Sequence, residues 1–222
     1  MSKRAIQILS SCSDMYKAKA TKKAKPAVKY VYMDEKVHLW LNDEIINMYM
    51  DLIIKRSPET IHAFNTFFYL SMSVNGYENV CRWTKNVDIF SKKKLLIPMH
   101  IDEENHWSLV CVDFEKKSIT YYDSLGNRNF VCLKQILQYL MFEHFDKKLV
   151  EFLPSGWTLT NMGRHCPQQS NLWDCGVFVC VFAEYLARDE KFDFSQKDMP
   201  RFRKQIKSEI INKKLRIDMP QA

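Results

Sequence analysis

An almost wholly apolar run at residues 177–186 is the feature that most limits how this chain can fold. A helix that is hydrophobic all round has to be buried, so the run predicts a helix in the interior of the domain. Cys175 and Gly176 stand immediately before this run. The sequence therefore predicts a cysteine at the N-terminus of a buried helix, with Gly176 leaving room there for the backbone of a substrate.

A cysteine in that position is suited to act as a nucleophile. The free N–H groups and the positive end of the helix dipole favour the thiolate over the thiol. Gln169 lies six residues upstream, where its amide can stabilise the oxyanion of an attacked carbonyl. Its neighbour Gln168 is the alternative for that role. Cys180, within the same apolar run, is expected to be an inert buried thiol.

A base is predicted from a hairpin about seventy residues earlier. Residues 106–114 and 118–123 are rich in β-branched and apolar side chains, and residues 115–117 form a polar break between them. If the chain folds back at the break, His106 and Asp123 lie on neighbouring strands, opposite each other to within one or two residues. An aspartate bonded to one imidazole nitrogen fixes the tautomer and leaves the other nitrogen for a thiol.

Other interpretations of these residues stay open from the sequence alone. Asp123 has the alternative role of capping the turn at residues 124–126. His100 is the nearby competitor of His106 and raises the alternative of a zinc site with two histidines and a cysteine. No spacing typical of a structural zinc site is present, so we expect no metal.

These segments resemble the Ulp/SENP family of SUMO-specific cysteine proteases, in particular the vertebrate-type SENP catalytic domain. The resemblance is carried by His106-Trp107, by Asp123-Ser124 and by residues 167–176. It extends to residues 40–47, 62–68, 82–85 and 199–204. The order His, Asp, Gln, Cys is itself discriminating, because papain-type enzymes place the cysteine before the histidine.

The resemblance implies an α+β fold of the papain-like cysteine protease superfamily. The fold has a central mixed sheet, and the catalytic cysteine begins a buried helix. The implied activity is cleavage after the C-terminal Gly-Gly of SUMO, as isopeptide deconjugation, precursor processing or both. Cys175 would be the nucleophile, His106 the base, Asp123 its partner and Gln169 the oxyanion donor. SUMO and SUMO-conjugated proteins are the implied partners, with no cofactor and no metal.

The resemblance also implies residues that bind the substrate. Trp40 and Trp107 would enclose the Gly-Gly tail in a narrow tunnel, which glycine can enter because it has no Cβ. Asp43 and Arg82 would contact the surface and tail of the modifier, although capping a helix is an equally good role for Asp43. Leu172 stands where the family usually has glycine. If that position required a positive φ, leucine would cost about 1 kcal/mol there.

Two other functions remain as alternatives. The first is a protease of the same superfamily that acts on NEDD8. The second is a non-catalytic module that binds a ubiquitin-like modifier. Covalent capture by a modifier with a C-terminal electrophile would separate the three.

Charge divides the chain into two predicted parts. Residues 1–29 hold eight Lys and Arg residues against Asp14, which accounts for the whole net charge of +7. We predict a basic arm at residues 1–29 and a protease domain at residues 30–222. The arm predicts nuclear localisation, with cytoplasm as a second location, and a weak nucleic-acid contact. A solvated arm and a mitochondrial presequence are the alternatives.

Composition limits the remaining function classes. The chain has no run of eighteen apolar residues, so we expect no membrane contact. Its seven cysteines include no C-x-x-C pair, which favours reduced thiols in an intracellular protein.

Hydrophobic spacing predicts several further elements. We expect a helix after a cap at Asn42 or Asp43, and a second buried helix over residues 61–70. Residues 95–99 predict a short strand, for which Pro98 suggests an edge position or a strand end. Later helices are expected over residues 131–142 and 202–215.

Overall fold

The computed structural model describes residues 40–101 and 105–216. The predicted arm at residues 1–29 lies outside the described residues, as do residues 30–39 of the predicted domain. The helices and strands follow in the order α2 (Asp43–Arg56), β1 (Ile61–Ala63), α3 (Phe68–Asn75), β2 (Lys94–Ile101), β3 (His106–Asp113), β4 (Ser118–Tyr122), α4 (Phe130–Lys148), β5 (Thr158–Asn161), α5 (Cys175–Ala187) and α6 (Met199–Asn212), with short 3-10 turns between some of them.

A five-stranded mixed sheet forms the centre of the fold, with the strand order β1-β2-β3-β4-β5. The middle strands β2, β3 and β4 run antiparallel to one another, whereas the outer pairs β1–β2 and β4–β5 are parallel. Helix α4 makes the crossover between β4 and β5, as a parallel pair requires. The prediction of an α+β fold around a mixed sheet is confirmed.

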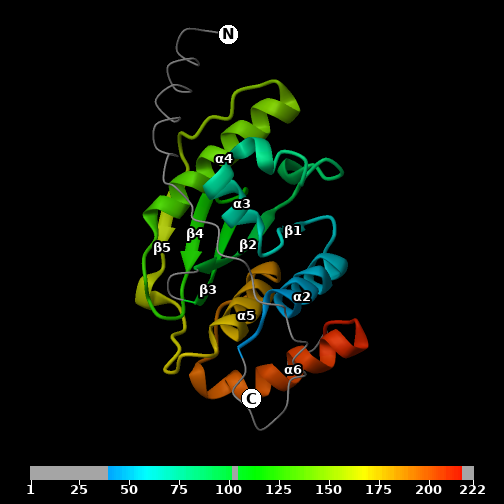
Figure 1. The fold of residues 1–222 in the computed structure, drawn as a ribbon, viewed down its shortest axis with the longest axis vertical. Coiled ribbons are helices and arrows are strands. Elements are labelled where there is room, and N and C mark those ends of the chain that lie inside the picture. Colours follow the sequence, from blue (N-terminus) through cyan, green and yellow to red (C-terminus); the bar gives the residue numbers. More distant parts are fainter. Residues whose placement is uncertain (1–39, 102–104, 217–222) are drawn as a thin grey trace.

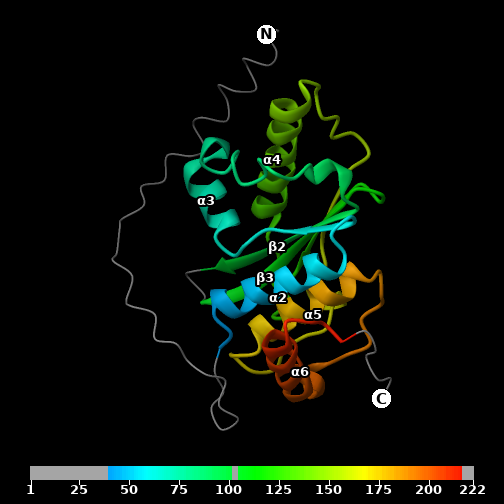
Figure 2. The same ribbon diagram turned by 90° about the vertical axis from the view of Figure 1, so that its right-hand side faces the viewer.

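Helices cover both faces of the sheet (Figure 1), with α3 and α4 on one face and α2, α5 and α6 on the other (Figure 2). Successive side chains of a strand point to opposite faces, so β3 contributes to two cores. Leu109 and Cys111 pack in the core that includes α5, whereas Val110 and Val112 pack in the core that includes α4. Every residue of β3 is therefore buried.

Two element predictions were wrong. Residues 61–70 do not form one helix, because residues 61–63 pair with β2 and α3 starts only at Phe68. Tertiary pairing overrides helical spacing there. Pro98 marks neither an edge strand nor a strand end, because β2 lies between β1 and β3 and continues to Ile101. The pairing with β1 ends at Leu96, so Pro98 lies where that side of β2 is already open.

The ends of the predicted helices also shift. Helix α4 extends to Lys148, well past the predicted end at residue 142, and α6 runs from Met199 to Asn212. Asn42 rather than Asp43 is the cap of α2, and its side chain accepts a bond from the N–H of Ile45.

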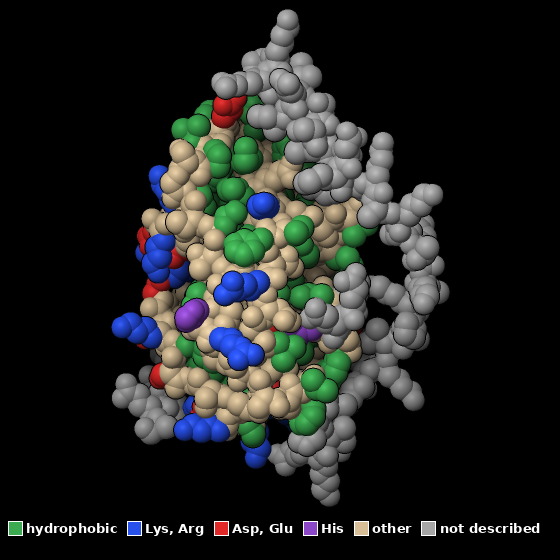
Figure 3. All heavy atoms as spheres, turned by 90° about the vertical axis from the view of Figure 1, so that its left-hand side faces the viewer, with side chains coloured by type: hydrophobic (Ala, Val, Ile, Leu, Met, Phe, Trp, Pro, Cys, Tyr) green, Lys and Arg blue, Asp and Glu red, His purple; other side chains and the backbone are tan. Residues whose placement is uncertain are grey.

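Figure 3 shows one face of the molecule, on which hydrophobic side chains lie in separate groups among polar and basic ones. Such scattered exposure is ordinary for a folded domain. Within the described ranges, none of the helices is both long and apolar enough to cross a membrane.

Candidate active site

Cys175 is the first residue of α5, and its side chain is buried. The helix is buried along nearly its whole length, because it packs against β3, α2 and α6. The structure therefore places this cysteine as the sequence predicts.

The expected role of Gly176 was wrong. A Cβ built on this residue would lie 2.8 Å from Cβ of Leu41 and 3.4 Å from its carbonyl oxygen. Glycine is required because the segment that leads into α2 crosses α5 closely at this point. The free space is filled by the protein's own chain and is not available to a substrate.

The β3–β4 hairpin brings His106 and Asp123 into contact. Nε2 of the imidazole lies 2.9 Å from Oδ1 of Asp123, and both side chains are buried. The same carboxylate accepts bonds from the N–H of Leu125 and the hydroxyl of Tyr121. A carboxylate can only accept, so Nε2 carries the proton in this bond. Nδ1 is left for the thiol of Cys175.

The surroundings of His106 favour the imidazolium ion. Burial alone lowers its pKa, but hydrogen bonds with Asp123 and Cys175 raise it further than burial lowers it. The resulting pKa is about 9. At neutral pH His106 is thus protonated and can donate a proton to a leaving group.

Gln169 and Gln168 have different environments. The backbone N–H of Gln169 donates to the carbonyl of Ser124, and its Oε1 accepts from the hydroxyl of the same serine at 2.6 Å. Its Nε2 donates to the carbonyl of Asn171 at 2.6 Å, which uses one of two hydrogens and leaves the other for an oxyanion.

Gln168 is held away from this role. Its Nε2 donates to the carbonyl of Cys166 at 2.9 Å and to that of Asp123 at 3.3 Å. These bonds brace the turn that carries Asp123. The amide of Gln168 is thus bonded within the turn, which leaves Gln169 as the candidate oxyanion donor.

Sequence reasoning gave no role to Ser124 or Asn171, although both hold the amide of Gln169. Ser124 was part of the matching motif after Asp123, and that adjacency was the available signal. Leu172, in the same loop, is exposed and has no positive φ. The strain considered for this position therefore does not arise.

The predicted substrate-binding residues are distributed unequally. Trp107 is buried, and its indole N–H donates to the carbonyl of Leu41 at 3.0 Å. This bond holds Leu41 against Trp107, and the half-exposed Trp40 is the residue before Leu41. Asp43 lies in the first turn of α2. Arg82 is exposed and lies in a turn that follows α3 in the sequence. The structure links neither Asp43 nor Arg82 to the catalytic groups.

His100 is not part of the catalytic contact. It pairs with Trp107 across β2 and β3, and the centroids of their rings lie 4.6 Å apart. Among the described residues no group of three or more His, Cys, Asp or Glu side chains is arranged to hold a metal ion. The six described cysteines are free thiols.

Known proteins match both the sequence and the fold. The family model of the Ulp1 protease family, C-terminal catalytic domain, matches residues 39–215. Sentrin-specific protease 3 of Mus musculus is 44% identical over 180 residues, which is 80% of this chain and 31% of that protein. Sentrin-specific protease 5 of Homo sapiens is 46% identical over 171 residues, or 77% of this chain and 22% of that protein. The chain thus spans less than a third of the length of these curated relatives.

A solved structure agrees with them. It is the X-ray structure of the C-terminal Ulp1 protease domain in complex with SMT3, the yeast ortholog of SUMO. It superposes with a TM-score of 0.70 at 34% identity, covering 80% of this chain and 79% of that one.

Proposed function

Because the chain belongs to the Ulp1 protease family, we propose that it is a cysteine protease specific for SUMO, cleaving after the C-terminal Gly-Gly of the modifier. The observation that carries the proposal is the position of His106, which contacts both Asp123 and Cys175. The substrates are SUMO precursors, SUMO-conjugated proteins or both.

The reaction proceeds in two steps. The thiolate of Cys175 attacks the carbonyl carbon of the last glycine, and the new C–S bond places negative charge on the carbonyl oxygen. Nε2 of Gln169 and the N–H of Cys175 stabilise that charge. His106 then gives its proton to the leaving amine as the C–N bond breaks, and a thioester remains.

The second step releases the modifier. His106, now neutral, takes a proton from water, and the resulting hydroxide adds to the thioester carbonyl. The C–S bond breaks, so Cys175 returns to the thiolate and the modifier leaves as a carboxylic acid, which loses its proton to the solvent. Asp123 keeps the imidazole oriented throughout.

Specificity for SUMO is supported by the relatives. The proteins at 44% and 46% identity are named sentrin-specific proteases, and the Ulp1 domain is complexed with a SUMO ortholog. Trp40 and Trp107 are proposed to enclose the Gly-Gly tail, and their proximity through Leu41 agrees with that role. Asp43 and Arg82 are proposed to contact the body of the modifier.

One capture experiment tests the proposal. The purified protein is mixed with SUMO, NEDD8 or ubiquitin, each carrying a C-terminal electrophile, and covalent adducts are counted by mass spectrometry. We expect an adduct with SUMO at Cys175, none with Cys175→Ser and a normal adduct with Cys180→Ser. Capture by NEDD8 and not by SUMO would mean that the protease acts on NEDD8. Capture by none would leave a non-catalytic binding module.

The basic arm is proposed to direct the protein to the nucleus and to make weak contacts with nucleic acid. Its support is the excess of positive charge in residues 1–29. Deleting these residues should abolish nuclear enrichment of a tagged protein and leave cleavage of SUMO within a few-fold. Loss of cleavage in a folded truncated protein would show that the arm belongs to the enzyme.

A further inference from the structure

The motif at residues 199–204 takes no part in the chemistry above, yet one of its side chains reaches the catalytic loop. Arg203 on α6 donates through Nε to Oδ1 of Asp174 at 2.8 Å, and a terminal guanidinium nitrogen lies 2.6 Å from the same oxygen. That terminal nitrogen also donates to the carbonyl of Trp173 at 2.9 Å. Asp174 and Trp173 immediately precede Cys175.

Asp174 is the centre of this contact. Its side chain is buried, and Oδ2 accepts bonds from the amides of Asn171 and Gln196, each at 2.7 Å. Both oxygens are thus satisfied by side chains, and Arg203 supplies the opposite charge that a buried carboxylate needs.

Asn171 connects this centre to the oxyanion donor. Its Oδ1 accepts from the backbone N–H of Trp173 at 3.2 Å and of Asp174 at 3.1 Å. Its carbonyl oxygen is the acceptor that holds Nε2 of Gln169 at 2.6 Å. A continuous path of hydrogen bonds therefore runs from Arg203 through Asp174 and Asn171 to Gln169.

We propose that Arg203 is a positioning residue for the hydrolytic reaction, holding the amide of Gln169 where the oxyanion forms. This proposal rests on the proposed function. Without the guanidinium, the Asp174 carboxylate loses its charge partner and turns toward water, which releases Asn171 and then Gln169. His106 and Asp123 are outside this path, so activation of the thiol does not depend on Arg203.

The test separates oxyanion stabilisation from thiol reactivity. Arg203→Gln and Arg203→Lys are compared with wild type for kcat and KM on a SUMO-fused fluorogenic reporter. The rate of alkylation by iodoacetamide, which needs no oxyanion donor, is measured on the same proteins. For Arg203→Gln we expect kcat to fall about 100-fold, KM to change less than about threefold and alkylation to change less than about twofold. Arg203→Lys keeps the charge and should recover part of kcat.

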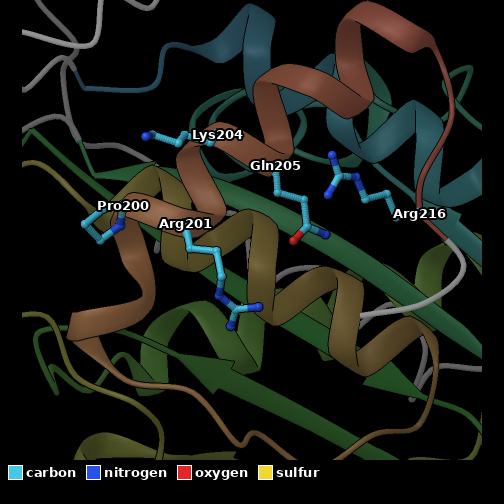
Figure 4. Close-up of a pocket in the computed structure, with 5 residues that line it drawn as sticks. All are labelled: Pro200, Arg201, Lys204, Gln205 and Arg216. Carbon is cyan, nitrogen blue, oxygen red and sulfur yellow. The ribbon is translucent and has the colours of Figure 1, made fainter. Parts of the chain in front are cut away.

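Two neighbours serve as matched controls. Arg201 and Lys204 lie on the same helix and line an open groove on it (Figure 4). The side chain of Arg201 is 44% exposed, and its nearest carboxylate, Asp198, is 3.8 Å away. We expect Arg201→Gln and Lys204→Gln to retain kcat within about twofold, because neither of them is bonded to Asp174.

Each outcome decides the matter. A normal kcat in Arg203→Gln overturns the proposal, and so does a parallel loss of kcat and alkylation, which would mean that Arg203 only supports the fold. If wild type and Arg201→Gln fail to cleave SUMO, the proposed function fails instead. If Arg203→Gln does not fold, Gln196→Ala removes another bond to Asp174 and leaves no unpaired charge. A selective loss of kcat is expected there, and its absence overturns the proposal.

Discussion

Replacing Asp123 with asparagine should move the alkaline limit of activity toward neutral pH. The pKa of His106 is raised from 6.5 to about 9 although burial lowers it, because Asp123 and Cys175 favour the imidazolium. This rise corresponds to about 3 kcal/mol, at 1.36 kcal/mol for each pKa unit. Asparagine has the same shape but no charge, so much of this stabilisation should be lost.

The direction of the effect follows from the raised pKa. A raised pKa means that the folded protein holds this proton more tightly than the unfolded chain does. The stabilisation is complete below pH 6.5 and is lost as the pH rises toward 9. Activity needs the proton on His106 for the leaving amine, so it should decline above about pH 9. In Asp123→Asn the decline should begin at lower pH, and kcat should fall by roughly 10²–10⁴.

The assay is kcat/KM for the SUMO reporter between about pH 6 and 10, with urea unfolding at both ends of that range. Wild type should lose stability across it, by up to about 3 kcal/mol, and the variant should lose less. His100→Gln is the control, because His100 bonds to Asn105 and not to Asp123. An identical alkaline limit in wild type and Asp123→Asn would refute the assigned cause of the raised pKa.

Four further substitutions test the site. Gln169→Ala should lower kcat by about 10²–10³ without unfolding, whereas Gln168→Ala should mainly lower the melting temperature; the reverse pattern would exchange their roles. Gly176→Ala should cost about 1–3 kcal/mol in urea unfolding, because its Cβ would meet Cβ of Leu41 at 2.8 Å, and an unchanged midpoint would contradict that clash. Trp107→Phe removes the bond to Leu41 and should lower kcat/KM for the SUMO reporter about tenfold with unchanged alkylation; a parallel loss of both would make Trp107 a core residue only.

The parts that could be predicted from the sequence are those governed by short-range patterns. The alternation in residues 106–123 and its polar break predict the hairpin, and the hairpin predicts the contact between His106 and Asp123. The apolar run after Cys175 predicts a buried helix, because the whole pattern lies within that one segment. In both cases the deciding residues lie within one element or one turn.

The parts that were missed depend on partners far along the chain. Residues 61–63 form a strand only because β2 lies beside them. Gly176 is needed because Leu41 crosses its helix, and Asp174 is paired with an arginine 29 residues later. No local spacing carries that information.

The distances along the chain between the catalytic groups bear on the order in which the site is assembled during folding. His106 and Asp123 are 17 residues apart in one hairpin, whereas α5 follows only after the α4 crossover and β5. Closing long loops costs more entropy than closing short ones, so the hairpin can form early in folding and α5 must dock later. We therefore expect His106 and Asp123 to come together before Cys175 reaches them. Before α5 docks on this hairpin no thiol is aligned with His106, so under the proposed function no substrate can be cleaved.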